Sequence, residues 1–228
     1  MGRLIVLEGT DGSGKATQSK LLLERLQKEG VDCLPLTFPR YGEPSCAPVE
    51  LYLSGKLGAR PGDVNAYAAS SFYAVDRYCS YKQSWGGFYE QGGVLIADRY
   101  TTSNAVHQAS KLPRAERKAF LDWLFGYEYG LLGLPEPTAV FYLDVPIELT
   151  ERMMRRREAE TGGAADIHER DEAYLRACRE TGEQLVADYG WQYVDCSRDG
   201  SMRRVEDIHE EIYKRARALL RRPDRIGD

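Results

Sequence analysis

The stretch GTDGSGKAT, at residues 9–17, contains the residue types that can hold a phosphate group. Gly9, Gly14 and Lys15 fit the spacing G-x-x-x-x-G-K-S/T, in which backbone N–H groups surround a phosphate and the lysine adds a positive charge. The last position, where a hydroxyl usually holds magnesium, is Ala16, and Thr17 follows one residue late. A Gly-rich turn with a surface lysine is the plain alternative. Because an apolar run precedes the loop and a helical pattern follows it, the context favours a nucleotide phosphate site made of Gly9, Thr10, Asp11, Gly12, Ser13, Gly14, Lys15, Ala16 and Thr17.

A second polar group, ADRY at residues 97–100, follows an apolar run that reads as a central strand. Ligands bind beside the carboxyl ends of strands in open parallel sheets. Asp98 has the oxygen chemistry to hold magnesium through water, and Arg99 has the forked donors that suit a phosphate. A structural Asp–Arg pair that caps the strand explains the same residues equally well.

Three further features suit nucleotide chemistry, and each has a simpler reading. Tyr73 and Arg77 are four residues apart, so they share a helical face and could stack on a base and bond its edge; a core tyrosine beside a surface arginine is commoner. Arg40 comes just after a strand candidate, within reach of a second phosphate. The run RMMRRRE includes Arg152, Arg155, Arg156 and Arg157. A solvated helix face is the plain reading of this run, but Arg152 and Arg156 place like charges at i,i+4, which costs a little unless an anion such as a phosphoryl group lies between them.

These residues need a scaffold, and the hydrophobic pattern predicts one. Short apolar runs rich in branched or aromatic residues indicate buried strands at 3–8, 93–98 and 139–145, with weaker candidates at 32–38 and 191–196. A helix is expected at 15–29, and a second one begins at an N-cap near Asp63. A third helix is expected at 113–130 and ends at Gly130, and three more follow in later segments. Strand and helix alternate, which predicts an α/β fold with a parallel sheet covered by helices on both faces.

Composition narrows the class of protein. The chain has 228 residues and a net charge of −4, which favours one domain and argues against a general nucleic-acid coat. Its five cysteines are scattered and include no C-x-x-C pair, so a reducing compartment is favoured. The apolar run at 4–7 is too short for a signal peptide or a membrane span. We therefore expect a cytoplasmic protein with neither a membrane nor a nucleic-acid partner.

Taken in order, VLEGTDGSGKATQ, FPR, YAVDR, DRYTTSNAVHQ, YLDVPIELTER and the Arg-rich segment resemble the thymidylate kinase family over nearly the whole chain. The resemblance implies a P-loop NTPase-type fold, one domain at 1–228 with a short Arg-rich lid at about 152–170, and a homodimer. It also implies transfer of the ATP γ-phosphoryl group to dTMP, giving dTDP for dTTP synthesis, with Mg²⁺ required. A kinase for other deoxynucleoside monophosphates and a non-catalytic P-loop binding protein are the alternatives; the absence of N-K-x-D counts against a GTPase switch.

The resemblance also implies residue roles. Lys15 and the loop amides would hold the donor phosphates, and Arg40 and Arg99 the acceptor phosphate. Around the acceptor nucleoside it implies stacking by Tyr73, a thymine contact by Arg77, pocket walls from Ser103 and Asn104, and sugar neighbours Asp11 and His107. Residues 10–13 include no arginine, so Arg155, Arg156 or Arg157 of the lid would stabilise the transition state.

Four features of the chain bear on this assignment. Mg²⁺ keeps several waters, so Asp11 and Asp98 are expected to replace the hydroxyl missing at Ala16. His107 stands where the family often has a tyrosine, and Ile167 where an arginine is common. The segment 126–137, GYEYGLLGLPEP, is longer than the usual connection, and its sequence predicts no role.

Overall fold

The computed structural model describes residues 1–161, 166–169 and 171–221, with the side chains of 155–161 outside the description. Within these residues, one sheet has the strand order β2-β3-β1-β4-β5, and every neighbouring pair is parallel. Its strands are β1 (Arg3–Glu8), β2 (Cys33–Thr37), β3 (Val94–Asp98), β4 (Ala139–Asp144) and β5 (Gln192–Asp195). All five were predicted, because strands buried on both faces read as apolar runs.

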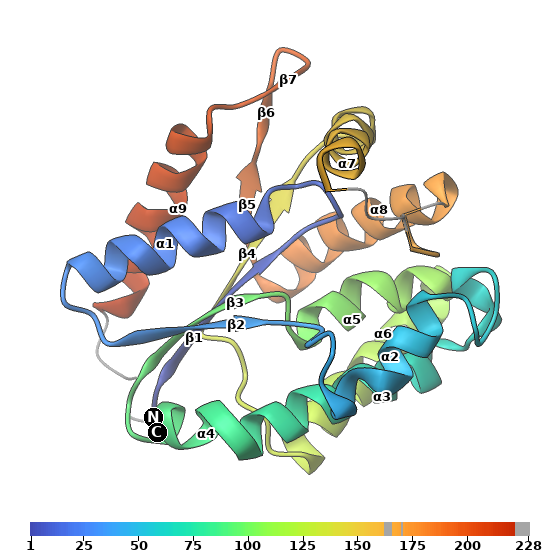
Figure 1. Cartoon of the computed structure of the whole chain (residues 1–228), viewed down its shortest axis with the longest axis horizontal. Helices are drawn as coiled ribbons and strands as arrows, with labels where there is room; N and C mark the ends of the chain where they lie inside the picture. Colours follow the sequence, from blue (N-terminus) through green and yellow to red (C-terminus); the bar gives the residue numbers. More distant parts are fainter. Residues whose placement is uncertain (162–165, 170, 222–228) are drawn as a thin grey trace.

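Helices cover both faces of this sheet, which confirms the predicted fold class (Figure 1). On one face, α1 (Lys15–Lys28) and α9 (Val205–Leu220) pack against the strands around Ile5, Phe141 and Val194. The other face carries α3 (Ala66–Ser80), α4 (Gly86–Glu90), α5 (Thr101–His107), α6 (Arg114–Phe125) and α8 (Glu172–Tyr189). The described helices do not cover the carboxyl ends of the strands. The polar segments that follow β1 and β3 begin at these ends.

The remaining elements are short or lie at the carboxyl-end edge. They are α2 (Ala47–Leu53), α7 (Ile147–Thr161), the hairpin of β6 (Ser197–Arg198) and β7 (Ser201–Met202), and three 3₁₀ turns at Pro44–Cys46, Pro61–Asp63 and Ala109–Lys111. Two π-helical segments, η3 (Tyr81–Trp85) and η5 (Gly126–Leu131), extend α3 and α6. In the described part of the chain, no helix has both the length and the apolar character needed to cross a membrane.

Two helix boundaries differ from the prediction. The helix expected from Asp63 begins at Ala66, because Asn65 is the N-cap and its side chain accepts a hydrogen bond from the Ala68 N–H at 2.8 Å. Asp63 instead ends a separate 3₁₀ turn and accepts from the Arg60 N–H at 3.0 Å. The helix expected to reach Gly130 ends as an α-helix at Phe125, and η5 follows it. A widened π turn changes the direction of side chains, which hydrophobic periodicity does not reveal.

Candidate active site

The phosphate-binding loop connects β1 to α1, as the sequence predicts, and its glycines explain its shape. Gly9 has φ 146°, and a Cβ atom there would lie 2.5 Å from the Leu143 carbonyl oxygen. Gly12 has φ 78°, and its Cβ would lie 2.8 Å from the Thr150 carbonyl oxygen. Side chains are therefore excluded at both positions by backbone conformation and by space. The loop ends at the N-terminus of α1, where backbone N–H groups favour a phosphate.

Lys15 lies at the start of α1 and is buried, with its Nζ donating to the Thr10 carbonyl oxygen at 2.8 Å. Burial and the nearby Arg99 guanidinium lower the pKa of Lys15 to about 8, although Asp11 opposes this shift. The lysine is thus a cation held against the loop by a neutral carbonyl. A phosphate beside the loop would add negative charge close to Lys15 and so favour its charged form.

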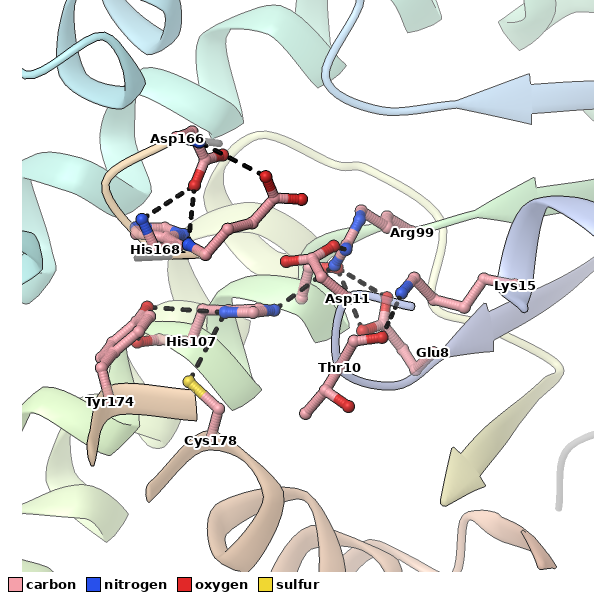
Figure 2. Close-up of polar contacts among 12 residues, drawn as sticks. Glu8, Thr10, Asp11, Lys15, Arg99, His107, Asp166, His168, Tyr174 and Cys178 are labelled. Atoms are coloured by element: carbon pink, nitrogen blue, oxygen red, sulfur yellow. Dashed lines mark hydrogen bonds and ion pairs between the residues drawn. The ribbon is translucent and has the colours of Figure 1, made fainter. Parts of the chain in front are cut away.

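Arg99 has a strained backbone at the end of β3. Its φ is 68°, in the left-handed region that a non-glycine residue seldom adopts, and its N–H donates to the Leu7 carbonyl oxygen at 3.2 Å. The side chain forms an ion pair with Asp11 and lies 3.3 Å, Nη1 to Nε2, from His107 (Figure 2). Arg99 therefore links the phosphate-binding loop to α5.

The charges on these groups are mutually dependent. Burial alone would raise the pKa of Asp11, but Arg99 and Lys15 outweigh it and hold that pKa well below its usual range. An arginine N–H can only donate, so His107 accepts through Nε2 and its ring is neutral with the proton on Nδ1. Burial and Arg99 likewise hold the pKa of His107 well below its ordinary value.

A cleft of about 770 Å³ opens beside this ion pair, within the size range of small-molecule sites. It brings together seven of the side chains singled out from the sequence: Asp11, Tyr73, Asp98, Arg99, Ser103, Asn104 and His107. They come from the loop, from α3, from the end of β3 and from α5. Ser103 donates to both oxygens of the buried Glu8 at 2.7 and 3.0 Å, which fixes one wall of the cleft.

Arg40 and Arg77, by contrast, do not line the cleft in this structure. The Arg40 Nε donates to Asp76 at 3.1 Å and its Nη2 to Ser45 at 2.8 Å. Arg77 is only 1% exposed, and its Nε and Nη2 donate to Glu128 at 2.7 and 2.6 Å. Each guanidinium has an internal carboxylate partner where the resemblance implies a ligand contact.

Sequence reasoning missed a wall of the cleft that follows α7. Asp166, His168 and Glu169 line it, and Figure 2 shows His168 beside His107. The two imidazole rings are stacked with centroids 5.6 Å apart. Burial raises the pKa of Asp166 to about 6 and lowers that of His168 to about 3. No motif marks these residues; only the fold brings them to the cleft.

The residues present can hold a magnesium ion in the way that Mg²⁺ usually binds, through one or two carboxylates, waters and substrate phosphates. The Oδ1 atom of Asp98 is buried and has no hydrogen-bond partner among the described residues. Ser13 Oγ is in the same situation, so the loop itself contains a buried hydroxyl without a partner among the described residues. The described residues include no group of three or more His, Cys, Asp or Glu side chains that could enclose a metal alone.

Comparisons with known proteins show to which family the chain belongs. A family model described as thymidylate kinase matches residues 7–212. A protein named thymidylate kinase from Mycobacterium tuberculosis is 32% identical over 191 residues, covering 82% of this chain and 87% of its own. Another from Halothermothrix orenii is 28% identical over 222 residues, covering 96% and 98%. The thymidylate kinase structure from Candida albicans has a TM-score of 0.70 at 19% identity, with 96% and 93% covered, which shows the same fold. The chain therefore belongs to the thymidylate kinase family, whose enzymes phosphorylate dTMP with ATP.

Proposed function

We propose that this chain transfers the γ-phosphoryl group of ATP to dTMP with the donor phosphates on the loop at 9–17 and dTMP in the adjoining cleft. The observation that carries this arrangement is the Asp11–Arg99 ion pair, which lies where the loop meets the cleft. Phosphoryl transfer needs positioned reactants and fixed positive charge more than covalent chemistry. Lys15 and Arg99 supply that charge on the two sides of this junction.

In this proposal, each group at the cleft has one task. Lys15 and the loop amides hold the donor, and Arg99 holds the acceptor phosphate. Tyr73 stacks on the base, and His107 borders the sugar. Arg40 joins the acceptor phosphate only by giving up part of its bonding to Asp76. Asp76 is buried, so it would keep Arg40 oriented as long as one hydrogen bond between the two residues remains.

The metal and the lid complete the proposal. Asp98, with its free buried oxygen, and Asp11 would hold Mg²⁺ through water, and the ion would neutralise charge on the transferred group. Arg155, Arg156 and Arg157 belong to α7, but their side chains lie outside the described residues. A transition-state role for one of them therefore stays a proposal, as does a lid at about 152–170. Replacing each with Ala should lower kcat for at least one by about 10³-fold; three near-normal variants would end this assignment.

The assembly and location are also proposals. Helix α3 exposes Tyr67, Val75 and Tyr78 by 41%, 45% and 37%, and their spacing places them on one face. Such an apolar face supports a homodimer through α3, which light scattering on the purified protein tests directly. A cytoplasmic location without membrane or nucleic-acid partners is the expectation that the composition supports.

A coupled ADP-release assay with ATP, Mg²⁺ and a panel of nucleoside monophosphates tests the proposed function. The kcat/KM for dTMP should exceed those for dUMP, dCMP, dGMP and dAMP. A base pocket that leaves buried polar groups unpaired with the wrong base rejects that base strongly. A higher value for a purine monophosphate would overturn the proposal in favour of a different acceptor.

A further inference from the structure

Glu128 is a buried carboxylate that the proposed mechanism does not use. It lies in η5, the π-helical turn at Gly126–Leu131, and its side chain is 0% exposed. The surrounding segment 126–137 has no role predicted from the sequence. A buried carboxylate is costly unless it is paired and hydrogen-bonded, so its partners show what the segment does.

Four donors surround the Glu128 carboxylate. The Nε and Nη2 atoms of Arg77 form a forked pair with it at 2.7 and 2.6 Å. The Thr101 hydroxyl donates to it at 2.7 Å, and the Asn104 amide nitrogen at 3.4 Å. Arg77 belongs to α3, while Thr101 and Asn104 belong to α5. Glu128 therefore ties together the two helices that carry Tyr73 and Asn104 to the cleft.

The same contacts fix the orientation of the Asn104 side-chain amide. Its Nδ2 faces two groups that can only accept, the Ser70 carbonyl oxygen at 3.3 Å and the Glu128 carboxylate at 3.4 Å. Reversing the amide would set its oxygen against both of these oxygens. The amide oxygen is therefore the atom that Asn104 presents to the cleft that it lines.

We infer that Glu128 is a positioning residue for recognition of the acceptor base, because its carboxylate, together with the Ser70 carbonyl, makes Asn104 present a hydrogen-bond acceptor to the cleft. This inference rests on the proposed function. Thymine and uracil carry an N–H at ring position 3, which such an acceptor can bind. Cytosine carries a lone pair there, which the Asn104 oxygen repels. Arg77 does not line the cleft. Its role in this proposal is to hold the Glu128 carboxylate in place.

The test compares three pyrimidine acceptors, dTMP, dUMP and dCMP, in the wild-type protein and in Glu128→Gln and Glu128→Asp. Gln can turn its NH₂ group toward Asn104, which leaves the Ser70 carbonyl as the remaining opponent of the reversed amide. Asp keeps the charge beside Arg77 and protects the fold, but is one methylene too short to retain every contact. Glu136→Gln, an exposed position in the same segment, is the matched control. The assay measures kcat/KM for each acceptor and KM for ATP.

We expect the dUMP/dCMP ratio of kcat/KM to fall about tenfold or more in Glu128→Gln, through a higher KM for dUMP. The ratio should fall less in Glu128→Asp. The dTMP/dUMP ratio, which reports only the methyl group, and the KM for ATP should not change. A merely structural role would weaken all three acceptors alike.

A dUMP/dCMP ratio within about twofold of wild type in folded Glu128→Gln, or an unchanged ratio in folded Glu128→Asp, would overturn the inference. A wild-type ratio near one would also overturn it, with no variant needed. Failure of the proposed function gives a different result: wild-type protein that releases no ADP with any pyrimidine monophosphate.

Discussion

The phosphate end and the base end of the cleft both contain arginines and carboxylates, but they use charge differently. At the phosphate end, Lys15 lies against the loop and Arg99 lines the cleft, and Asp11 is the carboxylate that raises the pKa of both most. At the base end, Arg77 and Glu128 form an ion pair with each other and are fully buried. The first arrangement retains positive charge for a ligand, whereas the second satisfies its charges internally and orients neutral polar atoms.

This difference assigns separate tasks to the two ends. A ligand phosphate carries negative charge, which Lys15 and Arg99 can stabilise directly although Arg99 also pairs with Asp11. A base carries no net charge, and a free guanidinium beside it would favour any acceptor atom. Substitutions at the phosphate end should therefore lower turnover for every acceptor, while those at the base end should change stability and selectivity.

The largest effect is expected at Lys15. Lys15→Ala removes the fixed cation beside the donor phosphates and should lower kcat/KM by about 10³-fold for every acceptor alike. Lys20→Ala, on the exposed face of the same helix, is the control and should be nearly normal. The measurement is steady-state ADP release with dTMP and dCMP each varied at saturating ATP. If Lys15→Ala lost only base selectivity, the division between the two ends would be wrong.

At the base end, the expected loss is in stability. Arg77→Met leaves the Glu128 carboxylate buried without its forked partner and should lower the free energy of unfolding by about 3 kcal/mol. Adding Glu128→Leu removes the orphaned charge and should recover much of that loss, because apolar groups can replace a buried ion pair. Urea denaturation of the single and double variants gives both values. A double variant less stable than Arg77→Met would show that the pair is not the source of the cost.

Arg99 tests the junction between the ends. Arg99→Lys keeps the charge but cannot fork between Asp11 and His107, so kcat/KM for dTMP should fall about 10²-fold. The KM for ATP should change much less, since Lys15 and the loop remain. Arg176→Lys, an exposed change on α8, serves as the matched control. Wild-type turnover in Arg99→Lys would mean that the fork has no part in transfer.

The pH dependence sharpens the account of Lys15. Because the pKa of Lys15 lies at about 8 instead of 10.5, kcat/KM for ATP should fall about tenfold per pH unit above pH 8. Between about 8 and 10.5 the unfolded chain binds more protons at this group, so its contribution to stability rises with pH. Activity should thus fall while the fold holds. Lys15→Arg should flatten the profile; an equal fall in that variant would implicate another group.

The smallest effect concerns Ala16. If Asp11 or Asp98 holds the metal through water, Ala16→Ser should change kcat less than about twofold at any Mg²⁺ concentration. Asp11→Asn should be costly, since it also frees Arg99 from its ion pair. Measuring kcat against Mg²⁺ concentration for wild type and both variants shows whether a carboxylate or a hydroxyl serves the metal. A large gain from Ala16→Ser, with Asp11→Asn unaffected, would show that the missing hydroxyl is a defect.

The two ends also differ in how far the sequence predicts them. The loop, β1 and α1 are contiguous, so the motif locates Lys15 and its surroundings, and Asp98 and Arg99 follow an apolar strand. Glu128 lies 51 residues from Arg77 and has no motif, so only the fold brings the two together. Asp76, Asp166 and His168 were missed for the same reason. The strands were predictable because burial imposes an apolar run, whereas the π turns leave no periodic signal.

The most direct test of the central claim is to follow the products of ATP, Mg²⁺ and dTMP with the wild-type protein by ³¹P NMR. Phosphoryl transfer through the loop and the cleft predicts that dTDP and ADP appear together in equal amounts, and that inorganic phosphate does not accumulate. ADP with inorganic phosphate and unchanged dTMP would contradict the account, since the cleft would then hold no acceptor beside the loop.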